Sequence, residues 1–212
     1  MPTNKQFTMT EHVRTVMEST LSLIDEAASA TGVFCSENLS EITRLELFQF
    51  VAYLCASDEI IQQEETDFLN QIFEEDWQPN DLADYLNNNA IRVGGFEEIV
   101  PFTLETLIKV DAALSNQKQD WRGSMCELFI SLYELLGEVF IETVPHTEEW
   151  EKFDLLTYTS FLKSFVYKNS PSFRPSSEGY KKDTIADFTS QSDDFIISAK
   201  KEDLGIIAPK KS

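Results

Sequence analysis

The chain has 212 residues, of which 42% are hydrophobic and 25% are charged, and this composition supports one sizeable core or two small ones and excludes a wholly disordered protein. Its 37 acidic and 17 basic residues give a net charge of -20, which argues against nucleic acid as a partner, since binding it requires phosphate neutralisation. Only 7 glycines and 7 prolines favour helices over a turn-rich β-sandwich.

The start of the chain and the cysteines indicate a cytoplasmic protein. Residues 1–10 lack the basic start and apolar stretch of a signal peptide, and no run of about 18 apolar residues could cross a bilayer. We therefore expect no membrane insertion. The three cysteines, Cys35, Cys55 and Cys126, are widely spaced beside apolar residues, which favours reduced thiols in or near the core over a zinc site.

The first half of the chain predicts four helices. An apolar pattern of helical period runs from Thr10, a candidate N-cap, to Gly32, and it leaves residues 1–9 as an N-terminal extension. A second helix begins at Ser40 and is apolar enough to be central. After a break at residues 57–59, helix resumes near Gln62 and ends by residues 77–79. A short helix from residue 80 precedes a loop at residues 87–95.

Three more helices are predicted after this loop. The first covers residues 96–114, with Pro101 in its first turns. The second covers residues 120–141, has a wide apolar face that predicts a central position, and is ended by Pro145. The last helix runs from about residue 147 to residue 165.

Charge separates a body from a tail. Residues 1–164 carry 9 basic and 30 acidic residues, a net charge of -21, whereas residues 165–212 carry 8 and 7, a net charge of +1. The segment after residue 168 is rich in Ser and Pro, which is typical of a linker. We therefore expect an all-α body of about seven helices at residues 10–166 and a mostly unstructured tail at residues 167–212. Apolar clusters at residues 195–197 and 205–207 are candidates for docking on the body or on another chain.

The sequence favours a protein without enzymatic activity or a cofactor. It has two histidines, no glycine-rich phosphate loop and no His-Glu-x-x-His motif, so the usual nucleophile–base and metal arrangements are missing.

One acidic segment supports two interpretations, a metal site and a helix cap. Asp58 and Glu65 flank a break between helices, and oxygen ligands from a loop and a helix start suit Ca²⁺ or Mg²⁺. Alternatively, Asp58 caps the coming helix, Glu64 and Glu65 interact with its positive N-terminal end, and Ile61 fills the core. We expect any cation to bind only weakly here.

Residues 47–65, LFQFVAYLCASDEIIQQEE, followed by FLNQIF at residues 68–73, resemble the signature of TerB-like domains, which include tellurite-resistance TerB and the N-terminal region of the DjlA co-chaperones. The usual pattern is an apolar helix, Asp-Gly, an aliphatic residue, and a Glu that opens the next helix. Asp58, Ile61 and Glu65 match this pattern, whereas Glu59 stands at the usual Gly. The resemblance implies an all-helical bundle whose halves form a pseudo-repeat.

A second copy of the pattern is present at residues 137–151, GEVFIETVPHTEEWE. Glu151 stands at the position of the Glu, but Val144 and Pro145 replace Asp-Gly. The second half therefore lacks the loop acid that a metal site built from both halves would need.

No Lys or Arg occurs between Arg44 and Arg92, although eleven carboxylates do. This stretch is either a solubilising surface or a docking surface for a basic protein, and an exposed Trp77 would favour docking. The predicted contact residues are Asp58, Glu64, Glu65, Glu74, Glu75, Asp76 and Trp77. Two functions fit these features: a non-enzymatic TerB-like adaptor or scaffold in a bacterial stress or envelope-linked assembly, or an inhibitor or immunity protein that neutralises a basic toxin or a nucleic-acid-binding protein.

Overall fold

The computed structural model describes residues 4–33, 38–88, 99–117, 124–145, 149–170 and 208–209. This part of the chain forms seven α-helices and two short strands. The elements are α1 (Asn4–Thr31), α2 (Leu39–Cys55), β1 (Ile60–Ile61), α3 (Gln63–Phe73), α4 (Pro79–Asn88), α5 (Phe102–Gln117), α6 (Met125–Thr143), α7 (Glu149–Asn169) and β2 (Ala208–Pro209). The prediction of an all-α bundle is confirmed.

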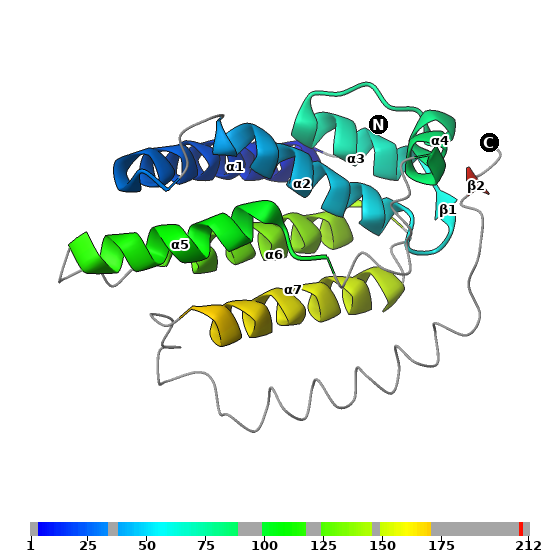
Figure 1. The fold of residues 1–212 in the computed structure, drawn as a ribbon. Helices are drawn as coiled ribbons and strands as arrows, with labels where there is room; N and C mark the ends of the chain where they lie inside the picture. Colours follow the sequence, from blue (N-terminus) through cyan, green and yellow to red (C-terminus); the bar gives the residue numbers. More distant parts are fainter. Residues whose placement is uncertain are drawn as a thin grey trace.

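Helix α6 lies at the centre of the bundle. It packs against α1, α2, α5 and α7, and Figure 1 shows it between α1 and α2 on one side and α7 on the other. The ring of Tyr133 on α6 is fully buried and lies 4.8 Å from Phe50 of α2 and 5.6 Å from Tyr158 of α7, measured between ring centroids. The wide apolar face of this helix predicts its central position, and the structure confirms it.

The first helix begins earlier than its apolar pattern predicts. Residues 4–9 belong to α1, and Thr10 lies inside the helix with a buried side chain, so Thr10 is not the N-cap. Lys5 and Gln6 are good helix formers that add nothing to an apolar pattern, which is why the sequence analysis missed this turn. The predicted end is correct, since Gly32 adopts a positive φ of 68° just after the last helical residue.

The later helices also differ from their predicted bounds. Helix α5 starts only at Phe102, because proline disfavours helical conformation in the residue before it, and residues 99–101 are not helical. Helix α6 starts at Met125, where the side chain of Ser124 accepts a hydrogen bond from the N–H of Glu127. Helix α7 continues to Asn169, so residues 167–169, predicted as tail, are helical.

Two of the three cysteines lie in the core, as predicted. Cys55 and Cys126 are buried and free, whereas Cys35 is outside the described residues. The segment at residues 89–98 and most of the predicted tail also lie outside them. Within the described helices, none is both long and apolar enough to cross a membrane.

Candidate functional site

The connection between α2 and α3 is a tight turn. The N–H of Glu59 donates to the carbonyl of Ala56 at 3.0 Å, and the N–H of Ile60 donates to Oδ1 of Asp58 at 2.9 Å. Glu59 has a φ of 66°, in the left-handed region that favours glycine. The side chain of Ile61 is fully buried, as predicted.

Gln62, not Asp58, is the N-cap of α3. Its backbone N–H donates to Oε2 of Glu65 at 2.7 Å, an interaction that belongs to a capping box. The prediction that Asp58 caps this helix is therefore wrong. The Asp58 carboxylate instead accepts a hydrogen bond from the backbone N–H of Ile60, before the helix begins. The predicted interaction of Glu65 with the start of the helix is correct.

Glu65 is a buried carboxyl group at the first turn of α3. Burial raises its pKa to about 8, and the nearby charges of Asp58 and Glu151 add to the effect, while the hydrogen bond from Gln62 opposes it. Burial and the charge of Glu65 also raise the pKa of the Cys55 thiol well above its usual range. Both groups are therefore protonated at neutral pH, which makes them poor ligands for a hard cation.

The predicted metal pair gains no further ligands. Among the residues that the structure describes, no three His, Cys, Asp or Glu side chains are grouped so as to hold a metal ion. Asp58 lies in the turn before β1 and Glu65 in the first turn of α3, and each already accepts a backbone hydrogen bond.

The other end of α3 holds Trp77 in place. Glu74 ends the helix in the left-handed conformation, with a φ of 59°. The side chain of Asn70 then forms two hydrogen bonds with the backbone of Trp77: Asn70 Nδ2 donates to the carbonyl at 2.9 Å, and the Trp77 N–H donates to Asn70 Oδ1 at 2.7 Å. Arg44 adds a hydrogen bond of 3.0 Å to the carbonyl of Phe73. These contacts fix a loop that has no regular secondary structure.

Aromatic side chains of α2, α3 and α4 form a cluster with Trp77 of this loop. The ring centroid of Phe48 is 5.6 Å from Phe73 and 5.7 Å from Trp77, and Trp77 is 5.2 Å from Tyr85. Leu45 lies one turn before Phe48 on α2 and is 52% exposed. We call these five residues, Leu45, Phe48, Phe73, Trp77 and Tyr85, the aromatic patch.

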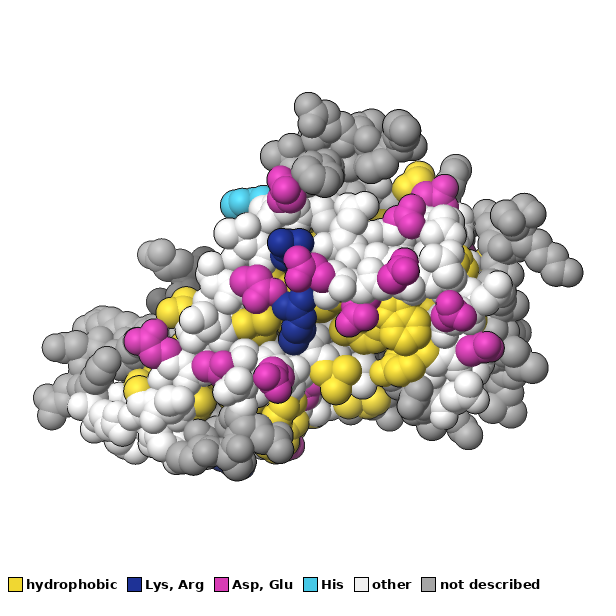
Figure 2. Space-filling view, turned by 90° about the horizontal axis from the view of Figure 1, so that it is seen from above, with side chains coloured by type: hydrophobic (Ala, Val, Ile, Leu, Met, Phe, Trp, Pro, Cys, Tyr) yellow, Lys and Arg dark blue, Asp and Glu magenta, His cyan; other side chains and the backbone are white. Residues whose placement is uncertain are grey.

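Trp77 is half-buried in the aromatic patch, which differs from the fully exposed side chain that would have favoured docking most strongly. Its ring N–H is buried and has no hydrogen-bond acceptor among the described residues. The outer members of the patch are Leu45, Trp77 and Tyr85, since Phe48 and Phe73 are buried beneath them. Figure 2 shows a hydrophobic area on this side of the molecule with acidic side chains around it.

The acidic stretch is partly neutralised by residues from other helices. Arg14 of α1 pairs with Glu74 at 2.8 Å, whereas Arg44 pairs with Glu18 of α1, which lies outside the acidic stretch. The carboxyl group of Glu46 faces α5, where burial raises its pKa and the N–H of Thr103 donates to it. Of the eleven carboxylates, Glu74 is therefore paired with a cation and Glu46 is turned towards α5. Four exposed carboxylates remain near the aromatic patch in sequence: Glu75, Asp76, Asp81 and Asp84.

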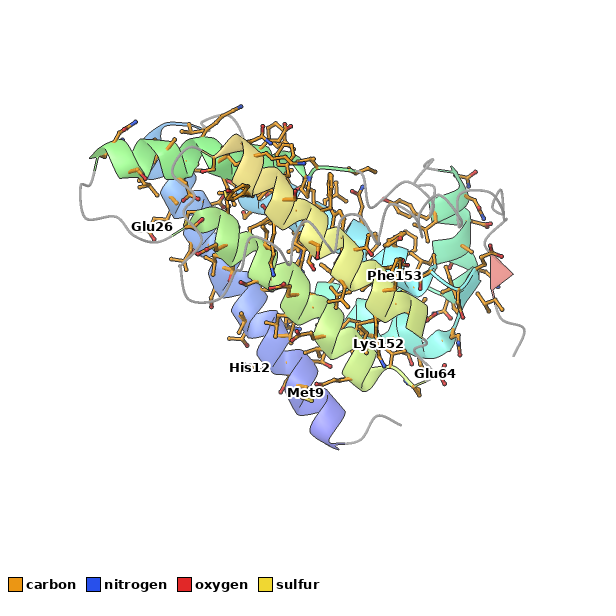
Figure 3. All side chains as sticks on the ribbon, turned by 90° about the horizontal axis from the view of Figure 1, so that it is seen from below. Met9, His12, Glu26, Glu64, Lys152 and Phe153 are labelled. Carbon is orange, nitrogen blue, oxygen red and sulfur yellow. The ribbon has the colours of Figure 1, made fainter. Side chains whose placement is uncertain are left out.

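The seven predicted contact residues do not form one surface. They lie at opposite ends of α3, which spans 11 residues and so roughly 15 Å. Asp58, Glu64 and Glu65 lie at its start, and Figure 3 shows Glu64 at the same end of the molecule as Lys152 and Phe153 of α7. Glu74, Glu75, Asp76 and Trp77 follow its last turn. Because Glu65 is only 3% exposed, it cannot contribute to a contact surface.

Four members of the aromatic patch were not among the predicted contact residues: Leu45, Phe48, Phe73 and Tyr85. Leu45 and Phe48 were assigned to the core as part of the dense apolar run of α2. A signal was available, because Tyr85 follows Asp81 by one helical turn on a strongly amphipathic helix whose polar side is acidic.

Comparisons with models of known protein families, with curated proteins and with solved structures found no match for this chain.

Proposed function

We propose that the chain is a non-enzymatic protein-interaction module of the TerB-like type, an adaptor or scaffold in a bacterial stress or envelope-linked assembly. The observation that carries the proposal is the aromatic patch with exposed carboxylates beside it. Exposed aromatic and aliphatic side chains within a polar border are typical of the centre of a protein–protein contact.

The construction of the patch supports a binding role. Asn70 and Arg44 fix the backbone on either side of residues 74–76, so Trp77 is held in position before any partner arrives. A surface ordered in advance loses little conformational entropy on binding.

Charge indicates the chemistry of the partner. Glu75 and Asp76 on the loop and Asp81 and Asp84 on α4 are exposed, and the described part of α4 contains no basic residue. A partner that presents an apolar side chain surrounded by Lys or Arg would match both the aromatic patch and the exposed carboxylates beside it. Attraction between the two surfaces would speed association and weaken with added salt.

The TerB-like part of the proposal is supported at the two helix starts. Glu65 and Glu151 match the Glu of the two pattern copies, both are the third residue of their helices, and both are buried. The left-handed backbone of Glu59 lies where the family pattern has Gly, the residue that adopts this conformation most readily.

A binding comparison tests the proposal. The chain is immobilised, exposed to a lysate of its source cells, and the retained proteins are quantified for wild type, Leu45→Lys and Asp76→Lys/Asp81→Lys. The matched controls are Leu156→Lys on α7, where Leu156 is 53% exposed, and Glu142→Lys on α6.

We expect the retained amount of at least one protein to fall by about tenfold or more with both patch variants and to stay unchanged with both controls. Less of this protein should be retained at high salt. If every retained protein is bound equally by all five chains, the patch is not a binding surface and the proposal fails.

A further inference from the structure

Strand β1 pairs with a segment from the far end of the chain. Ile60 lies opposite Ala208 and Ile61 opposite Pro209, in parallel register. Helix α4 contacts both strands, and Figure 1 shows β2 beside β1 at the end of the bundle that carries α3 and α4. The pairing lies at the start of α3, whereas Trp77 follows the last turn of this helix.

We propose that β1 is a docking edge for an extended segment, and that the C-terminal segment around Ala208–Pro209 is its resident occupant within the same molecule. Ile61 anchors β1 in the core, whereas Ile60 is 41% exposed beside the pairing. Addition of an extended segment to a free strand edge is a common mode of peptide recognition, in which backbone hydrogen bonds supply affinity.

Charge and chain length both favour this occupant. The sequence places Lys210 and Lys211 directly after the paired residues, and the turn beside β1 carries Asp58 and Glu59. The 37 residues from 171 to 207 extend at most roughly 120 Å, and α7 spans only about 30 Å, so the chain length allows the C-terminal segment to reach β1 of its own molecule.

The contact is small enough to be reversible. It consists of two residue pairs. Because Pro209 has no backbone N–H, it cannot donate a hydrogen bond to β1. A two-stranded contact of this size is marginal by itself. Attachment through the intervening chain raises the effective concentration of the segment to the millimolar range, which allows a weak contact to persist. The proposal does not rest on the proposed partner binding at the aromatic patch.

Disulfide trapping tests the proposal on the full chain. Residues opposite each other in neighbouring strands are close enough for a disulfide, so Ile60→Cys/Ala208→Cys is oxidised mildly and compared with Ile60→Cys/Ser198→Cys. We expect the 60–208 bond to form within one chain at least about tenfold faster than the 60–198 bond, because docking adds to tethering. Equal rates would overturn the proposal, and a product found only as a covalent dimer would show that a second copy is the occupant.

Hydrogen exchange provides a second readout without new cysteines. Ala208→Pro removes the N–H of Ala208 and so the pairing, and Ser212→Pro is the matched control. Backbone amides in the segment 57–62 should exchange about threefold faster or more in Ala208→Pro only. Unchanged exchange in Ala208→Pro would contradict docking at β1.

Discussion

Glu65 and Glu151 occupy the same place in two different helices: each is the third residue, of α3 and α7 respectively, and each side chain is almost fully buried. The charge of Glu151 is one of the causes that raise the pKa of Glu65. Two carboxyl groups that share a dry environment resist being ionised together. The stability of the protein should therefore depend on pH through Glu65.

The first prediction concerns that pH dependence. The pKa of Glu65 rises from 4.5 to about 8 on folding, so between these values the native state holds a proton that the unfolded state has lost. The free energy of unfolding contributed by this group therefore falls as pH rises from 4.5 to 8, and is constant outside that window. Glu65→Gln does not titrate and keeps a capping-box side chain.

The free energy of unfolding of Glu65→Gln, relative to that of wild type, should rise by more than about 1.4 kcal/mol between pH 5 and pH 9. This value is the equivalent of one pKa unit. Urea denaturation at both pH values measures this change, and the exposed neighbour variant Glu64→Gln is the control. A difference between Glu65→Gln and wild type that does not change with pH would show that Glu65 ionises normally in the folded protein.

The second prediction concerns the turn before α3. Glu59 adopts a φ of 66°, which is unfavourable for a residue with a Cβ atom. Glu59→Gly should be more stable than Glu59→Ala by about 1 kcal/mol, because both variants remove the carboxylate and only glycine relieves the backbone. Thermal or urea unfolding measures the difference. Equal stability of the two variants would mean that the turn is not held in this conformation.

These residues also show where reasoning from the sequence succeeds and where it stops. Local patterns predicted the helical class, the end of α1 at Gly32 and the buried Ile61, because apolar period and glycine act over a few residues. They could not place Arg14 beside Glu74, which depends on how α1 packs against the end of α3. For the same reason the burial of Trp77 between Phe48 and Tyr85 was not visible in the chain.

The pairing of β1 with β2 joins two segments that are far apart in the sequence. The apolar cluster at residues 205–207 was a candidate for docking, and the structure places the neighbouring residues Ala208 and Pro209 on β1. The cluster itself lies outside the described residues. Two-residue strands give no periodic signal, so the site of docking could not be predicted from the sequence.

The third prediction concerns divalent cations. Glu65 is mostly protonated at pH 7 and Asp58 accepts a hydrogen bond from Ile60, so Ca²⁺ or Mg²⁺ should bind at this turn with a Kd of about 1 mM or weaker. Isothermal titration calorimetry at pH 7 measures the affinity, with Asp58→Ala as the comparison. Micromolar binding that disappears in Asp58→Ala would establish a metal site that this account does not allow.

We expect the aromatic patch to bind a protein, and photo-crosslinking can identify that protein in the cell. A photoreactive amino acid replaces Tyr85 in the patch, or Tyr167 on α7, which is 51% exposed and serves as the control. After irradiation in the source cells, position 85 should give one dominant crosslinked protein that is absent at position 167. If position 85 gives no crosslinked protein, or only the products that the more exposed position 167 also gives, the aromatic patch is not the binding surface.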